Sequence, residues 1–280
     1  MESRLVRLFI YPSISMSYIN LFNKQIPTYG ILCMLGVLVA AIIGILLSKR
    51  QKFEIFDFLL IVVITLLCAF VGAKILAIVV SWEMVVTIFK NYSFVKAMEL
   101  VIRNGFVFYG GLIGGAIGLL VTLKIKKVNI YDYASIFVIC LTIGHALGRV
   151  GCFLGGCCYG IEYDGLLSFK YTNAMDSMTP IGVGLLPIQL IEAAFLLLSF
   201  SCLLFVYLKY NNKKFVVIAY LFFYPLLRFV IEFFRGDKER GLMFGLSTSQ
   251  WISIVIILLV TTFLIISEFR KKKAVATKIE

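Results

Sequence analysis

The sequence predicts an all-α protein that crosses a membrane several times. Hydrophobic residues make up 61% of the 280-residue chain and charged residues only 15%, and the mean hydropathy is +0.99. A water-soluble protein of this composition would expose more apolar surface than it could hide. The apolar residues also form runs long enough to cross a hydrocarbon layer of about 30 Å as helices. We therefore expect a polytopic integral membrane protein, a single transmembrane domain over residues 1–280 with about seven transmembrane helices.

The expected spans follow the apolar runs in chain order, and the charged residues fall between them. They cover residues 27–47, 56–80, 106–123, 131–147, 186–208, 215–234 and 250–267. The fourth is short because it runs directly into a glycine-rich stretch, where we expect a turn. The sizeable loops are residues 81–105 and 161–185. Residues 1–25 lack a continuous apolar core of signal-peptide length, so we expect them to be retained.

Lysines and arginines, counted by side, predict the orientation of the chain. In one set of connections they form short clusters next to helix ends, whereas the other set spreads fewer of them over longer segments. The clusters are Lys49, Arg50 and Lys52; Lys124, Lys126 and Lys127; Lys209, Lys213 and Lys214; and Arg270 to Lys273. The amino terminus is therefore expected outside and the carboxyl terminus in the cytoplasm. The net charge of +12 is then largely a topology signal with attraction to anionic membrane lipid, and it indicates no nucleic-acid partner.

Polar residues that a span should not contain gather in the outer halves of the predicted helices. A charge within the hydrocarbon costs about 2.5–3.5 kcal/mol on insertion, so such residues indicate a functional site. They are Tyr29, Lys74, Tyr109, Gly110, Gly111, His145, Arg149, Gln189, Glu192, Arg228, Glu232 and Arg235. The densest stretch, HALGRVGCFLGGCCYG from His145 to Gly160, holds the only histidine of the chain, an arginine and three cysteines.

Some of these residues also fit structural roles. Arg228, Glu232 and Arg235 are spaced i, i+4 and i+7 on one helix face, so Glu232 could brace both arginines. A brace leaves one positive charge without a partner, which favours function. The glycines at every fourth position of residues 110–118 form a small-xxx-small row typical of close helix packing. For His145, which stands one helical turn before an arginine, a structural and a functional role both stay open.

Arginines in a low-dielectric pocket, beside a turn whose glycines expose backbone N–H groups, form a site for an anion with several oxygens. In the outer leaflet that anion is a phospholipid headgroup. Guanidinium groups would hold its phosphodiester and stabilise the charge that develops on it as a leaving group. The residues alone indicate a phospholipid-using enzyme and a lipid-binding protein equally.

Four runs of sequence resemble the signatures of the prolipoprotein diacylglyceryl transferase family. They are YGGLIGG (residues 109–115), GRVGCFLGGCCYG (148–160), PIQLIE (187–192) and RFVIEFFR (228–235), and Tyr29-Gly30 is similar to the family's first-span motif. The resemblance implies an enzyme of the bacterial plasma membrane with its active site toward the outer leaflet and no cofactor. It implies transfer of the diacylglyceryl group from phosphatidylglycerol to the lipobox cysteine of a prolipoprotein signal peptide, with release of glycerol phosphate.

The resemblance also implies roles for individual residues. Arg149 matches an arginine expected to bind the headgroup, and Arg228 matches a second essential arginine. The expected substrate-binding residues are Arg149, Gly151, Cys152, Gly160, Arg235, Tyr29, Gly110 and Gly111, and the expected catalytic residues are Tyr109, Arg228 and His145. Three positions depart from the family pattern: Tyr109 stands for a histidine, Cys152 for an asparagine and Cys157 for a glutamate. The parts that hold phosphate are kept, whereas those that handle the proton and the acceptor are altered.

A thiol acceptor has to become a thiolate before it attacks carbon, and nearby arginines favour the thiolate. We predict that Tyr109 lies in the pocket and positions the acceptor or relays its proton, with His145 as the second candidate. Lys74 and Glu192 are expected to orient the arginines or to line the donor's entrance.

Two alternatives remain open from the sequence. One is a transferase with the same phospholipid donor and a different acceptor. The other is a metal or redox protein in which His145, Cys152, Cys157 and Cys158 bind zinc or form an exterior disulfide. The adjacency of Cys157 and Cys158, and the lack of a second C-x-x-C pair, argue against a tetrahedral site. We therefore expect no bound metal, and local packing for these cysteines.

Overall fold

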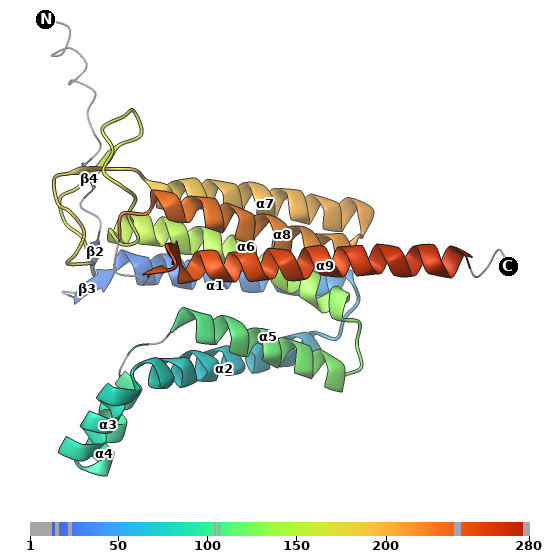
Figure 1. The fold of residues 1–280 in the computed structure, drawn as a ribbon, viewed down its shortest axis with the longest axis horizontal. Helices are drawn as coiled ribbons and strands as arrows, with labels where there is room; N and C mark the ends of the chain where they lie inside the picture. Colours follow the sequence, from blue (N-terminus) through green and yellow to red (C-terminus); the bar gives the residue numbers. More distant parts are fainter. Residues whose placement is uncertain are drawn as a thin grey trace, which may run out of the picture. The chain divides into compact units, whose positions relative to one another are not determined.

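The computed structural model describes residues 13–14, 17–21, 24–103, 105, 107–237 and 242–276. Helices dominate it, as the sequence predicts (Figure 1). They are α1 (Thr28–Arg50), α2 (Ile55–Val80), α3 (Trp82–Asn91), α4 (Phe94–Arg103), α5 (Phe108–Ile125), α6 (Ile130–Gly155), α7 (Ile188–Tyr210), α8 (Lys213–Ile231), the 3-10 helix η2 (Glu232–Phe234) and α9 (Thr248–Ala276). Six helical segments of the described chain are long and apolar enough to cross a membrane, namely residues 28–50, 55–80, 130–155, 188–210, 213–234 and 248–270. The chain is therefore an all-α multi-pass membrane protein.

The helices depart from the predicted spans in two places. α6 continues past residue 147, the predicted end of the fourth span, through the first glycines of the signature to Gly155. The predicted loop 81–105 contains the short helices α3 and α4. The third predicted span corresponds to α5, which has 18 residues, and its apolar part Tyr109–Ile125 is shorter than the six segments above. The number of spans and the side of each terminus stay predictions.

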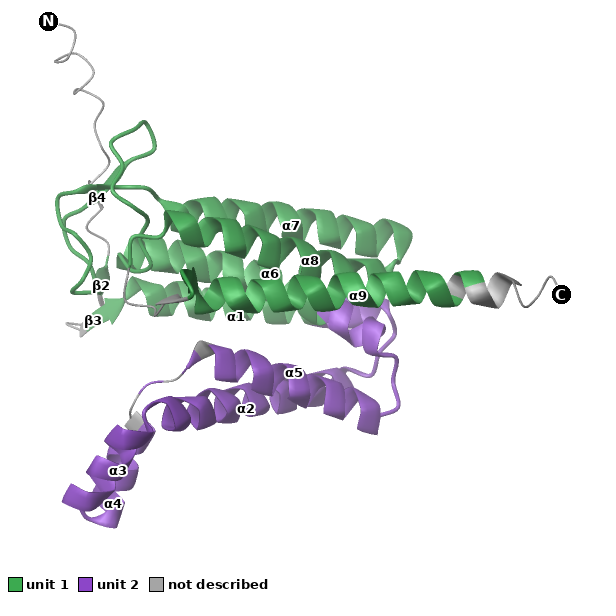
Figure 2. Ribbon diagram, in the orientation of Figure 1, with its two compact units in different colours: residues 1–44, 137–280 green, residues 45–136 purple. Residues whose placement is uncertain are grey.

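The described residues form two compact units, one of residues 1–44 and 137–280 and the other of residues 45–136 (Figure 2). The division falls within α1 and within α6.

In the first unit, long helices lie side by side and carry short strands and loops at one end (Figure 1). Two glycines let α1 and α6 approach closely, since a Cβ on Gly36 would lie 3.0 Å from the carbonyl oxygen of Gly144. A two-residue turn joins α7 to α8. Asn211 takes the left-handed conformation with φ 50°, and the Asn212 side chain caps α8 by accepting a hydrogen bond from the N–H of Phe215 at 3.1 Å.

The strands of this unit are short. β2 (Tyr18–Leu21) pairs with β3 (Lys24–Pro27), and β6 (Leu242–Met243) pairs with β7 (Leu246–Ser247), both antiparallel. The third sheet has the order β1-β4-β5, with β1 (Ser13–Ile14) parallel to β4 (Phe169–Tyr171) and β5 (Gly184–Leu185) antiparallel to β4. This sheet contributes Tyr171 and Leu185 to a small core with Phe153 and Tyr159. This core attaches the loop after α6 to the end of that helix.

In the second unit, α2 and α5 pack through the predicted glycine row. A Cβ on Gly110 would overlap the carbonyl oxygen of Gly72, and one on Gly114 would overlap the carbonyl oxygen of Cys68. The close-packing role of these glycines is therefore confirmed, because only the missing side chains let the two backbones approach this closely.

Candidate functional site

α6 ends in a turn that folds the following residues back onto the helix. Gly156 has φ +69°, in the left-handed region that favours glycine. The Gly156 N–H donates to the Phe153 carbonyl at 3.2 Å, and the Cys157 N–H donates to the Cys152 carbonyl at 3.1 Å. This pair of bonds is a Schellman motif. It places Cys157 next to Cys152, where the sequence had suggested only an open glycine turn.

Side chains from two other segments hold this turn in place. The Tyr171 hydroxyl donates to the Phe153 carbonyl at 3.0 Å. The Gln189 amide of α7 donates to the Cys157 carbonyl at 2.8 Å and to the Tyr171 hydroxyl at 3.4 Å. Burial raises the pKa of Tyr171 above its ordinary value of 10, so this phenol stays a hydrogen-bond donor at neutral pH.

Glu192 of α7 is the centre of a buried ion-pair network, and its side chain is only 2% exposed. Its Oε2 atom lies 3.0 Å from Nε of Arg149 and 3.5 Å from Nη1 of Arg228. Its Oε1 atom accepts a hydrogen bond from the Tyr224 hydroxyl at 3.2 Å and lies 3.7 Å from Nε2 of His145. Residues from α6, α7 and α8 therefore meet at one carboxylate.

The two arginines of this network are held differently. Both Nη atoms of Arg228 are engaged. Nη1 lies 3.5 Å from Oε2 of Glu192, and Nη2 lies 2.6 Å from Oε2 of Glu232 and donates to Oγ of Ser249 at 3.4 Å. Arg149 approaches Glu192 through Nε. Among the residues that the structure describes, nothing makes an ion pair or hydrogen bond with the two Nη atoms of Arg149. Arg149 therefore keeps a two-donor edge for a ligand.

Arg235 pairs with the carboxylate of Asp237, which was not predicted from the sequence. Its Nε and Nη2 atoms lie 2.9 and 2.7 Å from the two carboxylate oxygens of Asp237. Burial lowers the pKa of Arg235, but the hydrogen bond with Asp237 and the charge of that carboxylate raise it overall, so the guanidinium stays charged. The expectation that one arginine of this segment lacks a partner is wrong, because the helix ends before Arg235 and Asp237 folds onto it.

The predicted glycines of the signature bring backbones together. A Cβ on Gly151 would lie 3.3 Å from the carbonyl oxygen of Tyr29, so this glycine packs α6 against α1. Gly160 forms an antiparallel bridge with Arg235, and a Cβ there would overlap the carbonyl oxygen of Leu186. The substrate-binding roles expected for these residues stay predictions.

Several predicted site residues belong to the second unit. Tyr109, Gly110 and Gly111 lie in the first turn of α5, with Tyr109 half-buried. Lys74 of α2 donates to the carbonyl oxygen of Ile102 at 3.0 Å, so its ammonium group interacts with the carboxyl end of α4. The roles predicted for these four residues also stay predictions.

Residues 17–266 match a family model described as prolipoprotein diacylglyceryl transferase. The chain belongs to the prolipoprotein diacylglyceryl transferase family. It is 32% identical over 247 residues to phosphatidylglycerol–prolipoprotein diacylglyceryl transferase 2 of Clostridium perfringens (strain 13 / Type A), covering 85% of this chain and 90% of the relative. The enzyme of Clostridium tetani (strain Massachusetts / E88) is 31% identical over 253 residues, or 90% and 98% of the two chains. That of Dehalococcoides mccartyi (strain ATCC BAA-2266 / KCTC 15142 / 195) is 30% identical over 249 residues, or 88% and 91%.

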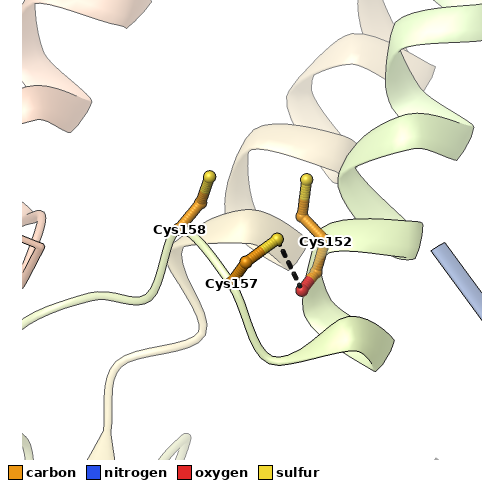
Figure 3. Close-up of side chains that lie close together, drawn as sticks. All are labelled: Cys152, Cys157 and Cys158. Atoms are coloured by element: carbon orange, nitrogen blue, oxygen red, sulfur yellow. Dashed lines mark hydrogen bonds between the residues drawn. The ribbon is translucent and has the colours of Figure 1, made fainter. Parts of the chain in front are cut away.

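Membership of the diacylglyceryl transferase family makes the chain a membrane-bound transferase. A group of three cysteines, Cys152, Cys157 and Cys158, lies at the end of α6. Their Sγ atoms all lie within 4.8 Å of one another, and Figure 3 shows them gathered at the turn. In the described part of the chain, His145 does not join this group as the metal alternative required.

Two further residues of the transferase's ion-pair network, Tyr224 and Ser249, were not predicted from the sequence. Tyr224 lies one helical turn before Arg228 on α8, and its ring contacts the His145 ring edge-on with centroids 5.3 Å apart. The i, i+4 spacing from Arg228, an arginine of the predicted site, was a signal that could have found it. Ser249 lies at the start of α9, and only the packing of α9 against α8 brings it to Arg228.

Proposed function

We propose that this chain transfers the diacylglyceryl group of phosphatidylglycerol to the cysteine thiol of a prolipoprotein. The family and the printed names of the relatives support this reaction. The observation that carries it in this chain is the two-donor edge of Arg149, buried in a membrane-spanning helix beside Glu192. A buried guanidinium edge binds two oxygens of a phosphodiester side by side.

The charge balance of the network explains how a donor would be recognised. Arg149 and Arg228 contribute two positive charges, and Glu192 and Glu232 contribute two negative charges. The empty network is therefore neutral when His145 is neutral and the acids are ionised. The donor's phosphodiester adds one negative charge, and we assign its binding to the two Nη atoms of Arg149, because Glu192 approaches that arginine through Nε.

In the reaction, the acceptor's sulfur forms a bond with the terminal glyceryl carbon, and the bond from that carbon to the phosphate oxygen breaks. The electron pair of that bond leaves on glycerol phosphate, where the second negative charge develops. Arg149 would stabilise this charge as it forms. Arg228 is held by Glu192 and Glu232. We therefore assign it the role of a fixed positive charge next to Glu192.

The thiol proton needs an acceptor. Tyr109 stays our first candidate for positioning the acceptor or relaying its proton. His145 is the second, and it has one observation in its favour: Glu192 lies 3.7 Å from its Nε2 atom. A carboxylate next to an imidazole orients the ring and stabilises the imidazolium that forms when the ring takes a proton.

The topology predicted from the basic clusters places this site toward the outer leaflet of the bacterial plasma membrane. There it would meet both phosphatidylglycerol and the lipobox cysteine of an exported prolipoprotein. The six apolar helical segments supply lipid-facing surfaces along which a diacylglyceryl chain can lie.

Complementation tests the proposal. We would express the chain in a bacterium whose own diacylglyceryl transferase can be depleted, and determine the mass of a reporter lipoprotein. The expected result is growth and a diacylglyceryl mass increment on the reporter's cysteine, both lost with Arg149→Ala. A correctly inserted protein that adds no such mass, while labelled phosphatidylglycerol is still consumed, would favour the transferase with another acceptor.

A further inference from the structure

The three cysteines at the end of α6 form a compact sulfur cluster that the phosphate network does not use. Cys152 is buried, and Cys157 and Cys158 are partly buried. All seven cysteines of the chain are thiols. Three sulfurs within 4.8 Å of one another are close to what a single ion requires, since tetrahedral Zn–S bonds of about 2.3 Å place sulfurs about 3.8 Å apart.

The backbone holds this arrangement before any ligand arrives. The Schellman motif fixes Cys157 against Cys152 through its 3.1 Å hydrogen bond. Cys158 follows with φ +58°, a left-handed conformation that costs a non-glycine residue about 1–2 kcal/mol. That conformation turns the chain between two adjacent cysteines, so both sulfurs reach the same place. The adjacency that argued against a metal site in the sequence is therefore no obstacle.

Contacts on both sides support the turn. The Gln189 amide holds the Cys157 carbonyl, and the Oε1 atom of Gln189 is buried with no hydrogen-bond partner among the described residues. Beyond the cysteines, the bridge between Gly160 and Arg235 ties the following segment to the end of α8. A site built on elements held in this way is preorganised, so little free energy is lost in ordering it.

We propose that Cys152, Cys157 and Cys158 bind one soft divalent metal ion, such as Zn²⁺, as three thiolates with the fourth position left for the acceptor thiol. Three sulfur donors select soft ions over Mg²⁺ or Ca²⁺. Sites with three protein ligands leave a fourth position open for a reacting group. Binding releases the three thiol protons to solvent.

The role of the fourth position rests on the proposed transferase function. A thiol that coordinates a divalent ion loses its proton to a base or to solvent, and the resulting sulfur nucleophile attacks the glyceryl carbon while the phosphate oxygen leaves. Cys152 lies three residues after Arg149 on α6, so both are on the same helix face. The cluster therefore lies next to the proposed donor site, and Cys152 and Cys157 stand at two of the three positions that depart from the family pattern.

Binding is tested on the purified full-length chain in detergent with a thiol-free reductant. Cd²⁺ serves as the probe because thiolate coordination gives it an ultraviolet charge-transfer band. We expect one ion per chain, displaced by Zn²⁺ and not by Mg²⁺. Cys152→Ser, Cys157→Ser and Cys158→Ser should each weaken binding at least tenfold, and Cys202→Ser, on the exposed face of α7, should leave it unchanged.

Alkylation of the unmodified chain covers the case in which a variant fails to fold. Cd²⁺ should protect Cys152, Cys157 and Cys158 from iodoacetamide, read by peptide mass, while Cys202 reacts as before. The proposed metal site would be contradicted if the fully reduced chain bound no Cd²⁺. It would also be contradicted if Cd²⁺ protected all seven cysteines equally from iodoacetamide.

The fourth position is tested by comparing chelator-treated and Zn²⁺-loaded protein. We expect transfer to fall at least tenfold without the ion and to return with Zn²⁺. If the chelator-treated and the Zn²⁺-loaded protein transfer equally, the ion does not activate the acceptor thiol. The Cd²⁺ experiments above then decide separately whether the metal site exists. No transfer by either form, with Cd²⁺ still bound, would contradict the proposed function and not the metal site.

Discussion

The Nε atom of Arg149 lies 3.0 Å from the Oε2 atom of Glu192, and this ion pair joins α6 to α7 within their apolar spans. The pair uses only one edge of the guanidinium group. The carboxylate therefore neutralises and orients the arginine without covering the Nη atoms that would hold a phosphodiester.

Replacing Arg149 by lysine keeps the charge but removes the two-donor edge. We expect turnover to fall at least tenfold, because a point charge cannot hold two phosphate oxygens side by side. Arg228→Lys should also reduce turnover, because one ammonium group cannot replace the Nη1 and Nη2 contacts with Glu192 and Glu232 that fix the charge in place. Arg50→Lys, at the exposed end of α1, serves as the control. Turnover is measured as the rate of diacylglyceryl transfer to a reporter prolipoprotein at saturating phosphatidylglycerol. Normal turnover and donor binding in both lysine variants would contradict the phosphate-binding role.

Glu192→Gln should weaken stability and activity together. It removes the shared counter-charge of two buried arginines, and breaking a buried pair from one side costs about 3–5 kcal/mol. The matched control is Glu99→Gln, which removes an exposed pair with Lys96 at 2.9 Å and should cost less than about 1 kcal/mol. Unfolding in mixed micelles measures the loss of free energy of unfolding in each of the two variants. A stable, correctly inserted Glu192→Gln protein without activity would instead place Glu192 in contact with the substrate.

The proton acceptor is identified by a pair of variants. We expect Tyr109→Phe to lower turnover by about 100-fold, the usual range for loss of an acid–base group, with protein level and donor binding unchanged. His145→Ala should have a smaller effect. If only His145→Ala shows the large loss, the proton passes to the imidazole beside Glu192. The pH dependence of turnover in each variant distinguishes loss of a base from loss of positioning.

Gly114→Val should separate α2 from α5. Its Cβ would overlap the carbonyl oxygen of Cys68, and overpacking of this kind costs about 1–3 kcal/mol. Gly30→Ala is the matched control, because a Cβ there meets no atom within 4 Å. Thermal aggregation in detergent compares the two. Equal stability of both variants would show that α2 and α5 do not pack this closely.

Tyr171 should make the free energy of unfolding decrease with rising pH in the alkaline range. Burial raises its pKa in the folded chain, so the folded state favours the neutral phenol. The resulting stabilisation is complete below the unfolded pKa of about 10 and is lost as the pH rises above it. Tyr171→Phe lacks the hydrogen bond to Phe153 and should cost about 1 kcal/mol at neutral pH. Between pH 9 and about 11, the free energy of unfolding of the Tyr171→Phe variant should fall less than that of the unmodified chain. Unfolding measured across that pH range tests this.

Composition and pattern by themselves determined the all-α membrane class, since runs of apolar residues of spanning length have no other stable form in lipid. They also determined the packing role of the glycine row at 110–118, because fourfold spacing on a helix places small residues on one face. Arg149, Arg228 and Glu192 were identified as polar residues of one site, since buried charges in spans rarely occur without a function.

Tertiary structure decided how those residues are paired. Asp237 neutralises Arg235 only because the helix ends at Phe234 and the chain turns back. Ser249 reaches Arg228 only through packing of α9 against α8. The three cysteines converge because Gly156 and Cys158 take left-handed backbone conformations. The sequence placed these cysteines in one short stretch, but the left-handed conformation of Cys158, a residue that is not glycine, could not be predicted from it. That conformation brings the sulfurs of two adjacent cysteines to the same place.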